Sequence, residues 1–162
     1  MFLKSLMING FKSFANKTVL EFSKNLIGIV GPNGSGKSNI CDAIRWDLDE
    51  QSTKALRVEC MNDVIFGGTL MQPPSEFAEV RIVFDNKSHF FNIDSNELVI
   101  NRKLNRDGNS EYRINGEVSS LKGVREIMTG TGHSCAACSI ISMSAVDWNV
   151  TSGSGLRLII EE

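Results

Sequence analysis

The first half of the chain predicts strands that lead into a helix. Residues 3–9 and 18–22 read as extended segments, and the continuous apolar run at residues 26–30 is typical of a strand buried on both faces. After a glycine-rich stretch, apolar residues recur at helical spacing over residues 37–48. We therefore expect a β-rich entry, a turn and a helix, followed by an irregular polar stretch at residues 49–62.

The second half of the chain predicts antiparallel strands. Apolar residues alternate with polar ones at residues 80–84 and 98–100, so each segment has one face suited to a core. Asp-Gly at residues 107–108 and Asn-Gly at residues 115–116 are hairpin turn signals. Two serines then precede a segment with an apolar face, which predicts a capped helix over residues 121–128.

Composition indicates a soluble globular domain. The chain has 162 residues, of which 41% are hydrophobic and 22% charged, and its formal charge is −2. No apolar run approaches the ~20 residues of a membrane helix, and the N-terminus lacks an export signal, so we expect a cytoplasmic protein. The net charge gives no global attraction to DNA. The basic residues Arg102, Lys103 and Arg106 fit a solvated strand face better than a DNA site.

The four cysteines are too few and too unevenly spaced for a secreted disulfide framework, so we expect free thiols. Cys135 and Cys138 form a C-x-x-C with His133 close by, which could supply three zinc ligands. The local sequence shows no evident fourth ligand, and a single C-x-x-C is weak evidence for zinc.

Residues 31–38 form a complete phosphate-binding loop with the pattern G-x-x-x-x-G-K-[ST]. Gly34 and Gly36 let the backbone approach phosphate oxygens, Lys37 reaches the β- and γ-phosphates, and Ser38 can coordinate Mg²⁺. Asn33 is a further candidate donor for the γ-phosphate. A glycine-rich turn without a ligand could carry the same residues, but the apolar run before it and the helical pattern after it favour a nucleoside triphosphate site.

Further short segments are more specific together than this loop is alone: Asn9-Gly10-Phe11-Lys12-Ser13-Phe14, Asp42-Ala43-Ile44-Arg45-Trp46, Glu50-Gln51-Ser52, Asp63-Val64-Ile65-Phe66, Tyr112-Arg113-Ile114-Asn115-Gly116 and Ser139-Ile140-Ile141-Ser142. In this order, nearly from end to end, the chain resembles the N-terminal half of the ATPase head of SMC (structural maintenance of chromosomes) proteins of the bacterial chromosome-condensation type.

The resemblance implies an α/β fold: an ABC-type P-loop NTPase lobe with a mixed sheet, an antiparallel β subdomain and flanking helices over residues 1–162. In that family the head is split between the two ends of a long chain, joined by an antiparallel coiled coil and a hinge. Two heads sandwich two ATP molecules, and the cycle of binding and hydrolysis drives DNA entrapment and chromosome segregation. The N-terminal half supplies the P-loop and Gln loop; the C-terminal half, with the ABC signature and Walker B carboxylates, is absent here, as is the coiled coil.

The resemblance also implies roles for individual residues. Lys37 and Arg57 would act in catalysis, Arg57 from the position of the family's arginine loop, and Ser38 would hold Mg²⁺. Arg57 could equally be a solvated loop cation, and Asp63, which borders the base and ribose in the family, could simply cap a turn. The full set of expected ATP-binding residues is Lys12, Pro32, Asn33, Gly34, Ser35, Gly36, Lys37, Ser38, Asn39 and Asp63.

Two C-terminal segments imitate motifs of the missing half. Residues 158–162 look like a Walker B strand because apolar residues precede paired carboxylates, yet the resemblance places them at the entry to the coiled coil. Residues 151–155 faintly echo the signature loop but lack its leucine and double glycine, so we interpret them as a turn.

The chain departs from the family pattern near the nucleotide. Met143 stands at the glutamine of the Gln loop, and a thioether is a poor Mg²⁺ ligand, so hydrolysis should suffer more than binding. Asp47 lies on or beside the apolar stripe of the predicted helix, where an unpaired carboxylate costs several kcal/mol, and Asp49 replaces a terminating glycine. Val58 and Cys60 replace glycine and lysine.

These departures, together with the replaced stretch at residues 133–138, fit a divergent relative, a deliberately substituted protein or an acquired metal site. We expect an ATP- and Mg²⁺-binding half-head for chromosome condensation and segregation, which binds ATP with little turnover alone. Its expected partners are the C-terminal half, a second head, DNA through the full assembly and kleisin-type subunits, in the nucleoid. The alternatives are a catalytically degenerate pseudo-ATPase interaction module and a split-head DNA-repair ATPase.

Overall fold

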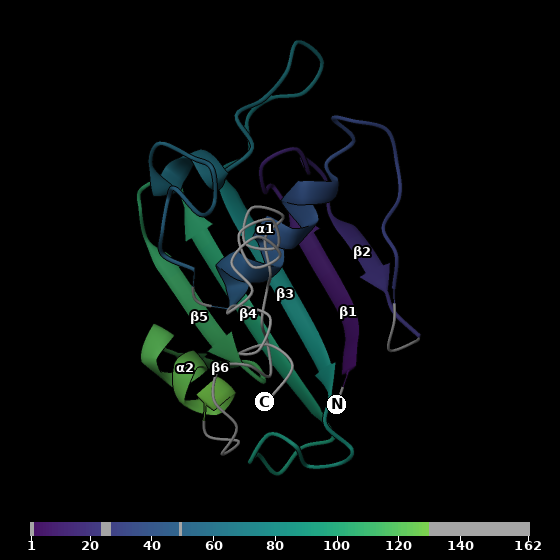
Figure 1. The fold of residues 1–162 in the computed structure, drawn as a ribbon. Coiled ribbons are helices and arrows are strands. Elements are labelled where there is room, and N and C mark those ends of the chain that lie inside the picture. Colours follow the sequence, from purple (N-terminus) through teal and green to yellow (C-terminus); the bar gives the residue numbers. More distant parts are fainter. Residues whose placement is uncertain (1, 24–26, 49, 130–162) are drawn as a thin grey trace, which may run out of the picture.

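The computed structural model describes residues 2–23, 27–48 and 50–129, and a six-stranded sheet is its main feature (Figure 1). In chain order the strands are β1 (Phe2–Asn9), β2 (Thr18–Glu21), β3 (Phe77–Asp85), β4 (Glu97–Asn105), β5 (Ser110–Ile114) and β6 (Glu117–Ser119). In space the order is β2-β1-β3-β4-β5-β6, and every neighbouring pair is antiparallel. The antiparallel subdomain expected from the sequence is therefore confirmed.

Three helical segments accompany the sheet: α1 (Lys37–Asp47), the short 3-10 helix η1 (Met61–Val64) and α2 (Leu121–Thr129). α1 lies across β3 and β4, and α2 lies near the β5 and β6 end of the sheet (Figure 1). The two helices predicted from the sequence are thus confirmed to within one residue at each end. No helix in the described part of the chain is long and apolar enough to cross a membrane.

The alternation along β3 and β4 explains where the core lies. Val80, Ile82 and Phe84 of β3 are buried, as are Leu98 and Ile100 of β4. The register pairs Ile82 with Ile100 and Phe84 with Leu98, so these side chains stand on one face of the sheet. They belong to one hydrophobic cluster with residues of α1 and α2, which therefore cover the same apolar face.

The turn signals have the backbone conformations that they predict. Asn115 and Gly116, between β5 and β6, both have positive φ angles, 51° and 89°, as a tight hairpin turn requires. Gly108, between β4 and β5, has a φ of 86°. The backbone N–H of Gly123 donates to the hydroxyl of Ser120 at 3.2 Å, so this serine caps α2 as expected.

The strand expected at residues 26–30 is not formed. Residues 27–30 have no pairing partner among the described strands, and their side chains are exposed, with Ile27 and Ile29 42% and Val30 92% accessible. A strand that is apolar on both faces is stable only when neighbouring strands pair with it and both faces are covered. The described residues supply neither, so the segment lies unpaired on the surface.

The sequence analysis expected Arg102, Lys103 and Arg106 on a solvated strand face, and for Arg102 this is wrong. Arg102 is only 2% exposed, and its guanidinium lies 4.3 Å from the ring centroid of Trp46 and 4.9 Å from that of Tyr112. Its Nη1 donates to the carbonyl of Trp46 at 2.7 Å. Lys103 lies over an aromatic ring, and Arg106 donates to backbone carbonyls. Arg102 therefore serves the packing of the fold, whereas Arg106 is exposed just after β4.

Candidate functional site

The phosphate-binding loop lies exposed before α1. Gly34 and Gly36 have φ angles of 82° and 87°, in the left-handed region that glycine adopts without a steric penalty. The ammonium of Lys37 donates to the carbonyls of Gly31 at 2.7 Å and Pro32 at 2.6 Å. The lysine therefore lies within the curve of its own loop, where the P-loop pattern places the phosphate-binding cation.

The start of α1 favours an anion. Gly36 is the N-cap residue and provides no side-chain cap, and no acidic residue lies in the first turn. The first N–H groups of a helix have no partner within it and carry a partial positive charge, which favours phosphate. The hydroxyl of Ser38 is a hard oxygen ligand suited to Mg²⁺. These groups fit a magnesium-bound nucleoside triphosphate, with Asn33 and Ser35 beside them on the exposed loop.

A tight turn after β1 supports the loop from the side. The Nδ2 of Asn39 donates to the hydroxyl of Ser13 at 2.8 Å, and a Cβ atom at Gly36 would lie only 3.0 Å from that hydroxyl. Gly36 is thus required both by its φ angle and by this close approach. Phe11 and Phe14 bridge to each other across the same turn. The turn holds the N-terminal end of α1 in place against β1.

Two cations from distant segments converge on one carboxylate oxygen. The Nζ of Lys12 and the Nη2 of Arg57 each lie 2.5 Å from Oδ2 of Asp42, in the middle of α1. Asp42 is 2% exposed and Lys12 10%, whereas Arg57 is 54% exposed. Lys12 also donates to the carbonyl of Leu56. We call Lys12, Asp42 and Arg57 the charge cluster.

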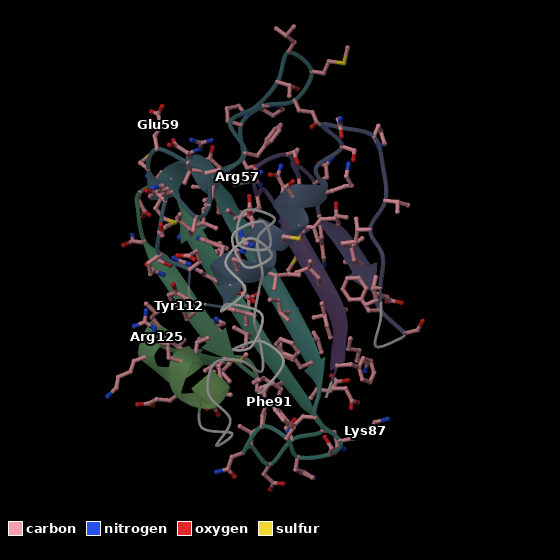
Figure 2. The ribbon with its side chains drawn as sticks, in the orientation of Figure 1. Arg57, Glu59, Lys87, Phe91, Tyr112 and Arg125 are labelled. Atoms are coloured by element: carbon pink, nitrogen blue, oxygen red, sulfur yellow. The ribbon has the colours of Figure 1, made fainter. Side chains whose placement is uncertain are left out.

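Both cations of the charge cluster have a left-handed backbone, with φ angles of 48° at Lys12 and 55° at Arg57. Such angles cost an L-residue roughly 1–2 kcal/mol, so the surroundings must hold them. Arg57 lies at the end of the molecule away from Phe91 and Lys87 (Figure 2). The structure thus brings two predicted site residues together, through an aspartate that the sequence analysis did not select.

Sequence reasoning missed Asp42 because a single aspartate in a helix is most often a solvated charge. Its position carries a signal nevertheless: it follows Ser38 by four residues, which puts both side chains on one helix face about 6 Å apart along the axis. For a charged residue on this face of a helix that begins at a phosphate loop, we expect a partner of opposite charge.

Asp63 caps η1. Its Oδ2 accepts the backbone N–H of Cys60 at 2.8 Å, and this hydrogen bond lowers the pKa of the Asp63 carboxyl. The neighbouring Val64 carbonyl accepts the backbone N–H of Lys12 at 2.7 Å, so η1 lies against the turn that supports the loop. The capping role considered from the sequence is present, and a contact of Asp63 with base or ribose stays a prediction.

Asp47 lies at the other end of α1, against the sheet. It is fully buried, and within the described part of the chain neither carboxylate oxygen has a hydrogen-bond partner of acceptable geometry. Burial raises the pKa of Asp47 well above its ordinary value, and the positive charge of Arg102 opposes this rise only in part. The buried position expected for Asp47 from the sequence is therefore confirmed, and the energetic cost of burying it stays a prediction.

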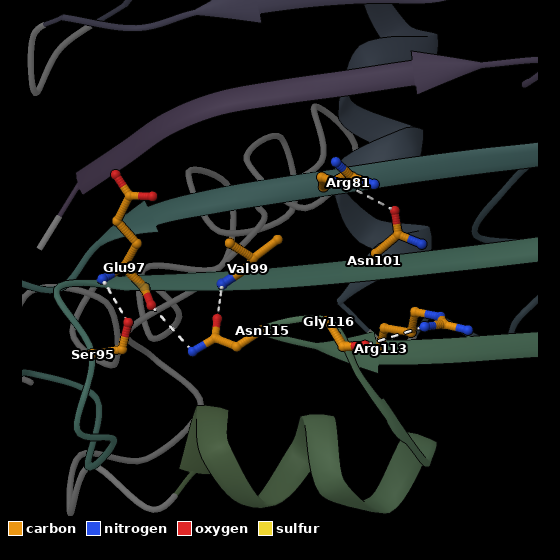
Figure 3. A pocket seen from close by; sticks show the side chains of 8 residues that line it. All are labelled: Arg81, Ser95, Glu97, Val99, Asn101, Arg113, Asn115 and Gly116. Atoms are coloured by element: carbon orange, nitrogen blue, oxygen red, sulfur yellow. Dashed lines mark hydrogen bonds between the residues drawn. The ribbon is translucent and has the colours of Figure 1, made fainter.

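A second concave surface lies on the open face of the sheet, opposite α1 (Figure 3). Its cations are already occupied: Arg81 donates to Asn101, and Arg113 to Glu111 and the carbonyl of Gly116. None of the predicted site residues lines it. The lining residues are Arg81, Ser95, Glu97, Val99, Asn101, Arg113, Asn115 and Gly116.

Several sequence-based expectations lie outside the described residues. These are the Gln-loop position Met143, the possible zinc ligands His133, Cys135 and Cys138, the segments 151–155 and 158–162, and Asp49. Within the part of the chain that is described, no group of three or more His, Cys, Asp or Glu side chains could hold a metal ion, and Cys41 and Cys60 are free thiols. Phosphate oxygens and water are further ligands that a Mg²⁺ ion at Ser38 would take.

Comparison with known proteins gives the same family from sequence and from structure. Residues 2–136 match the RecF/RecN/SMC N terminal domain. The Chromosome partition protein Smc of Lactiplantibacillus plantarum is 50% identical over 147 residues, which are 91% of this chain and 12% of that protein. The chain thus spans about one eighth of the length of this curated relative.

Solved SMC heads share the fold. A chain from work on ATP-driven dimerization and DNA-stimulated activation of SMC ATPases superposes with a TM-score of 0.87 at 37% identity, covering 99% of this chain and 98% of that one. The Smc head domain of Pyrococcus furiosus, with an extended coiled coil and bound to the C-terminal domain of ScpA, gives 0.86 at 38% identity, covering 98% and 40%. The chain belongs to the RecF/RecN/SMC N-terminal domain family, and its fold is that of the N-terminal part of an SMC ATPase head.

Proposed function

We propose that this chain is the ATP-binding half of an SMC-type ATPase head that acts in chromosome condensation and segregation. The observation that carries the proposal is the loop at the start of α1, where Gly34, Gly36, Lys37 and Ser38 have the conformations and chemistry of a triphosphate site. The relatives are named for chromosome partition, and one solved relative comes from work on ATP-driven dimerization. Both support the proposal.

The residues of this chain would bind and orient the nucleotide. Loop N–H groups and the Lys37 ammonium neutralise phosphate charge, Ser38 contributes a ligand to Mg²⁺, and Lys12 and Arg57 add positive charge beside the middle of α1. The bound magnesium nucleotide supplies the phosphoryl group whose transfer to water would drive the cycle. Asn33 and Asn39 complete the loop, and Asn39 is held in place by Ser13.

The exposed segment at residues 27–30 supports a role as one half of a larger head. Three apolar side chains of this segment are exposed, and it pairs with no described strand. We infer that strands of the C-terminal head half pair with it and that the same half supplies the groups needed for hydrolysis. A second head, DNA bound by the whole assembly and a kleisin-type subunit are further proposed partners, at the nucleoid in the cytoplasm.

Calorimetric titration of the 162-residue chain with MgATP tests the proposal, with Lys37→Ala as the site variant. We expect binding by the unsubstituted chain and a loss of at least tenfold in affinity for Lys37→Ala, because a charge-assisted contact is worth about 1.5–3 kcal/mol. The matched control is Lys122→Ala, which removes an exposed lysine of α2 and should leave affinity unchanged. No heat of binding and no protection of the loop amides would overturn the proposal.

A pseudo-ATPase interaction module is the second candidate, because Asp47 introduces an unpaired buried carboxylate at the end of the nucleotide helix. The two functions differ when the C-terminal head half is added. Phosphate release at a rate well above that of the isolated chain favours the ATPase. Tight MgATP binding without phosphate release favours the module.

A further inference from the structure

The charge cluster carries more positive than negative charge. One oxygen of Asp42 receives both Lys12 and Arg57, so a single carboxylate faces two full positive charges. Lys12 is nearly buried and has the Leu56 carbonyl as a second acceptor. Arg57 is more than half exposed, and Asp42 is its only ion-pair partner among the described residues. Arg57 is therefore the member of the cluster that can most easily change its partner.

The position of the charge cluster relative to the phosphate-binding loop indicates which new partner Arg57 could take. Asp42 follows Ser38 by one helical turn, and helical side chains lean toward the N-terminus of the helix. A phosphate held by the loop amides would lie beyond Ser38, on the N-terminal side of Asp42, and the rise from Ser38 to Asp42 along the helix axis is about 6 Å. Guanidinium groups bind phosphate oxygens at least as well as they bind carboxylates, often with two hydrogen bonds.

We propose that Asp42 is a positioning residue for the nucleotide site: it holds Arg57 beside α1, and Arg57 exchanges the Asp42 carboxylate for a phosphate oxygen when the triphosphate binds. This inference rests on the proposed function and adds to it a competing partner for Arg57. Lys12 remains with Asp42 after the exchange, so the carboxylate is never left buried without a counter-charge.

The exchange predicts that MgATP binds more tightly when the Asp42 carboxylate competes less strongly for Arg57. Asp42→Asn keeps the size of the side chain and an acceptor oxygen but removes the negative charge. We expect MgATP affinity at 150 mM salt to rise about fivefold or more. In an Arg57→Gln background the same substitution should give about twofold or less, since only the through-space repulsion is relieved there.

The double-mutant cycle has clear contrary outcomes. A fall in affinity with Asp42→Asn, or an equal gain in both backgrounds, would overturn the exchange and leave Asp42 with a structural role alone. Arg113→Gln is the matched control, because Arg113 is also a half-exposed arginine in an ion pair but lies on the other face of the sheet. Its MgATP affinity should equal that of the unsubstituted chain.

Nuclear magnetic resonance of the unsubstituted chain covers the case in which Asp42→Asn does not fold. On saturation with MgATP, we expect the Nε–H signal of Arg57 and the carboxyl carbon signal of Asp42 to move together with the amide signals of Gly34 and Gly36. Glycine signals that move while the Asp42 carbon stays unchanged would overturn the exchange but not the nucleotide site. Glycine signals that do not move would overturn both.

Discussion

The helix α1 buries two aspartates, one in its middle and one at its C-terminal end, and the two carboxylates have different surroundings. Asp42, near the phosphate loop, pairs with two cations through one oxygen. Asp47, the last residue of α1, has a cation nearby but no hydrogen-bond partner of acceptable geometry among the described residues. The first carboxylate organises the cations that we assign to the site, and the second costs stability. The role of a buried carboxylate can therefore be inferred only together with the groups that pair with it.

Removal of the Asp42 carboxylate should have the largest effect on stability. Asp42→Ala leaves the nearly buried Lys12 and the guanidinium of Arg57 without their shared counter-charge, and such losses cost about 3–5 kcal/mol. Urea unfolding followed by circular dichroism would measure the change. A loss below about 1 kcal/mol would mean that water or another acceptor satisfies both cations.

Asp47→Val should act in the opposite direction. Valine is somewhat larger than aspartate but removes two buried oxygens that have no partner among the described residues, so we expect the free energy of unfolding to rise by about 1–2 kcal/mol at neutral pH. Asp47→Asn serves as the control, because it removes the charge but keeps buried polar atoms. Destabilisation by Asp47→Val would show that attraction to Arg102 outweighs the cost of burial.

The raised pKa of Asp47 gives a pH dependence with a defined sign. The ordinary carboxyl pKa is about 3.9, and a higher value in the folded state means that the folded chain binds this proton more tightly than the unfolded chain. Its contribution to stability is therefore fully present below about pH 4 and is lost as pH rises from there through the raised pKa.

The measurement compares unfolding of the unsubstituted chain and Asp47→Val between about pH 4 and pH 8. The stability of the unsubstituted chain should fall relative to that of the variant across this range. The difference between the two curves cancels groups that both proteins share, such as Asp63 with its lowered pKa. A constant difference would place the pKa of Asp47 near its ordinary value.

The smallest expected effect separates the charge of Arg57 from its backbone. Arg57→Gln and Arg57→Gly both remove the guanidinium, but only glycine adopts a φ of 55° without strain. We expect the glycine variant to be more stable than the glutamine variant by about 1 kcal/mol in thermal unfolding. Equal stability would indicate that the loop relaxes to another conformation when the ion pair with Asp42 is lost.

Sequence patterns that act locally predicted most of the described fold. The alternation of β3 and β4, the Asn115-Gly116 turn and the Ser120 cap depend on neighbouring residues, and all three are confirmed. The pattern failed at residues 27–30, because the strength of a buried strand depends on strands beside it, which a local pattern does not contain.

Only the part of the candidate site that is contiguous in the sequence was predictable. The loop from Gly31 to Ser38 is visible as a motif, whereas the pairing of Lys12 and Arg57 through Asp42 joins three segments that come together only in the folded chain. The burial of Arg102 was missed for the same reason, since Trp46 and Tyr112 approach it from α1 and β5.

The position of β1 in the sheet determines the order in which the strands can pair while the protein is synthesised on the ribosome. β1 can pair with β2 at once, but its other edge waits for β3, where Phe2 meets Asp85. At about 5–20 residues per second, synthesis of the intervening segment takes several seconds. During that time the candidate phosphate-binding loop belongs to a chain segment that is attached to the sheet at one end only. The loop gains a fixed base when β3 has been synthesised and pairs with β1.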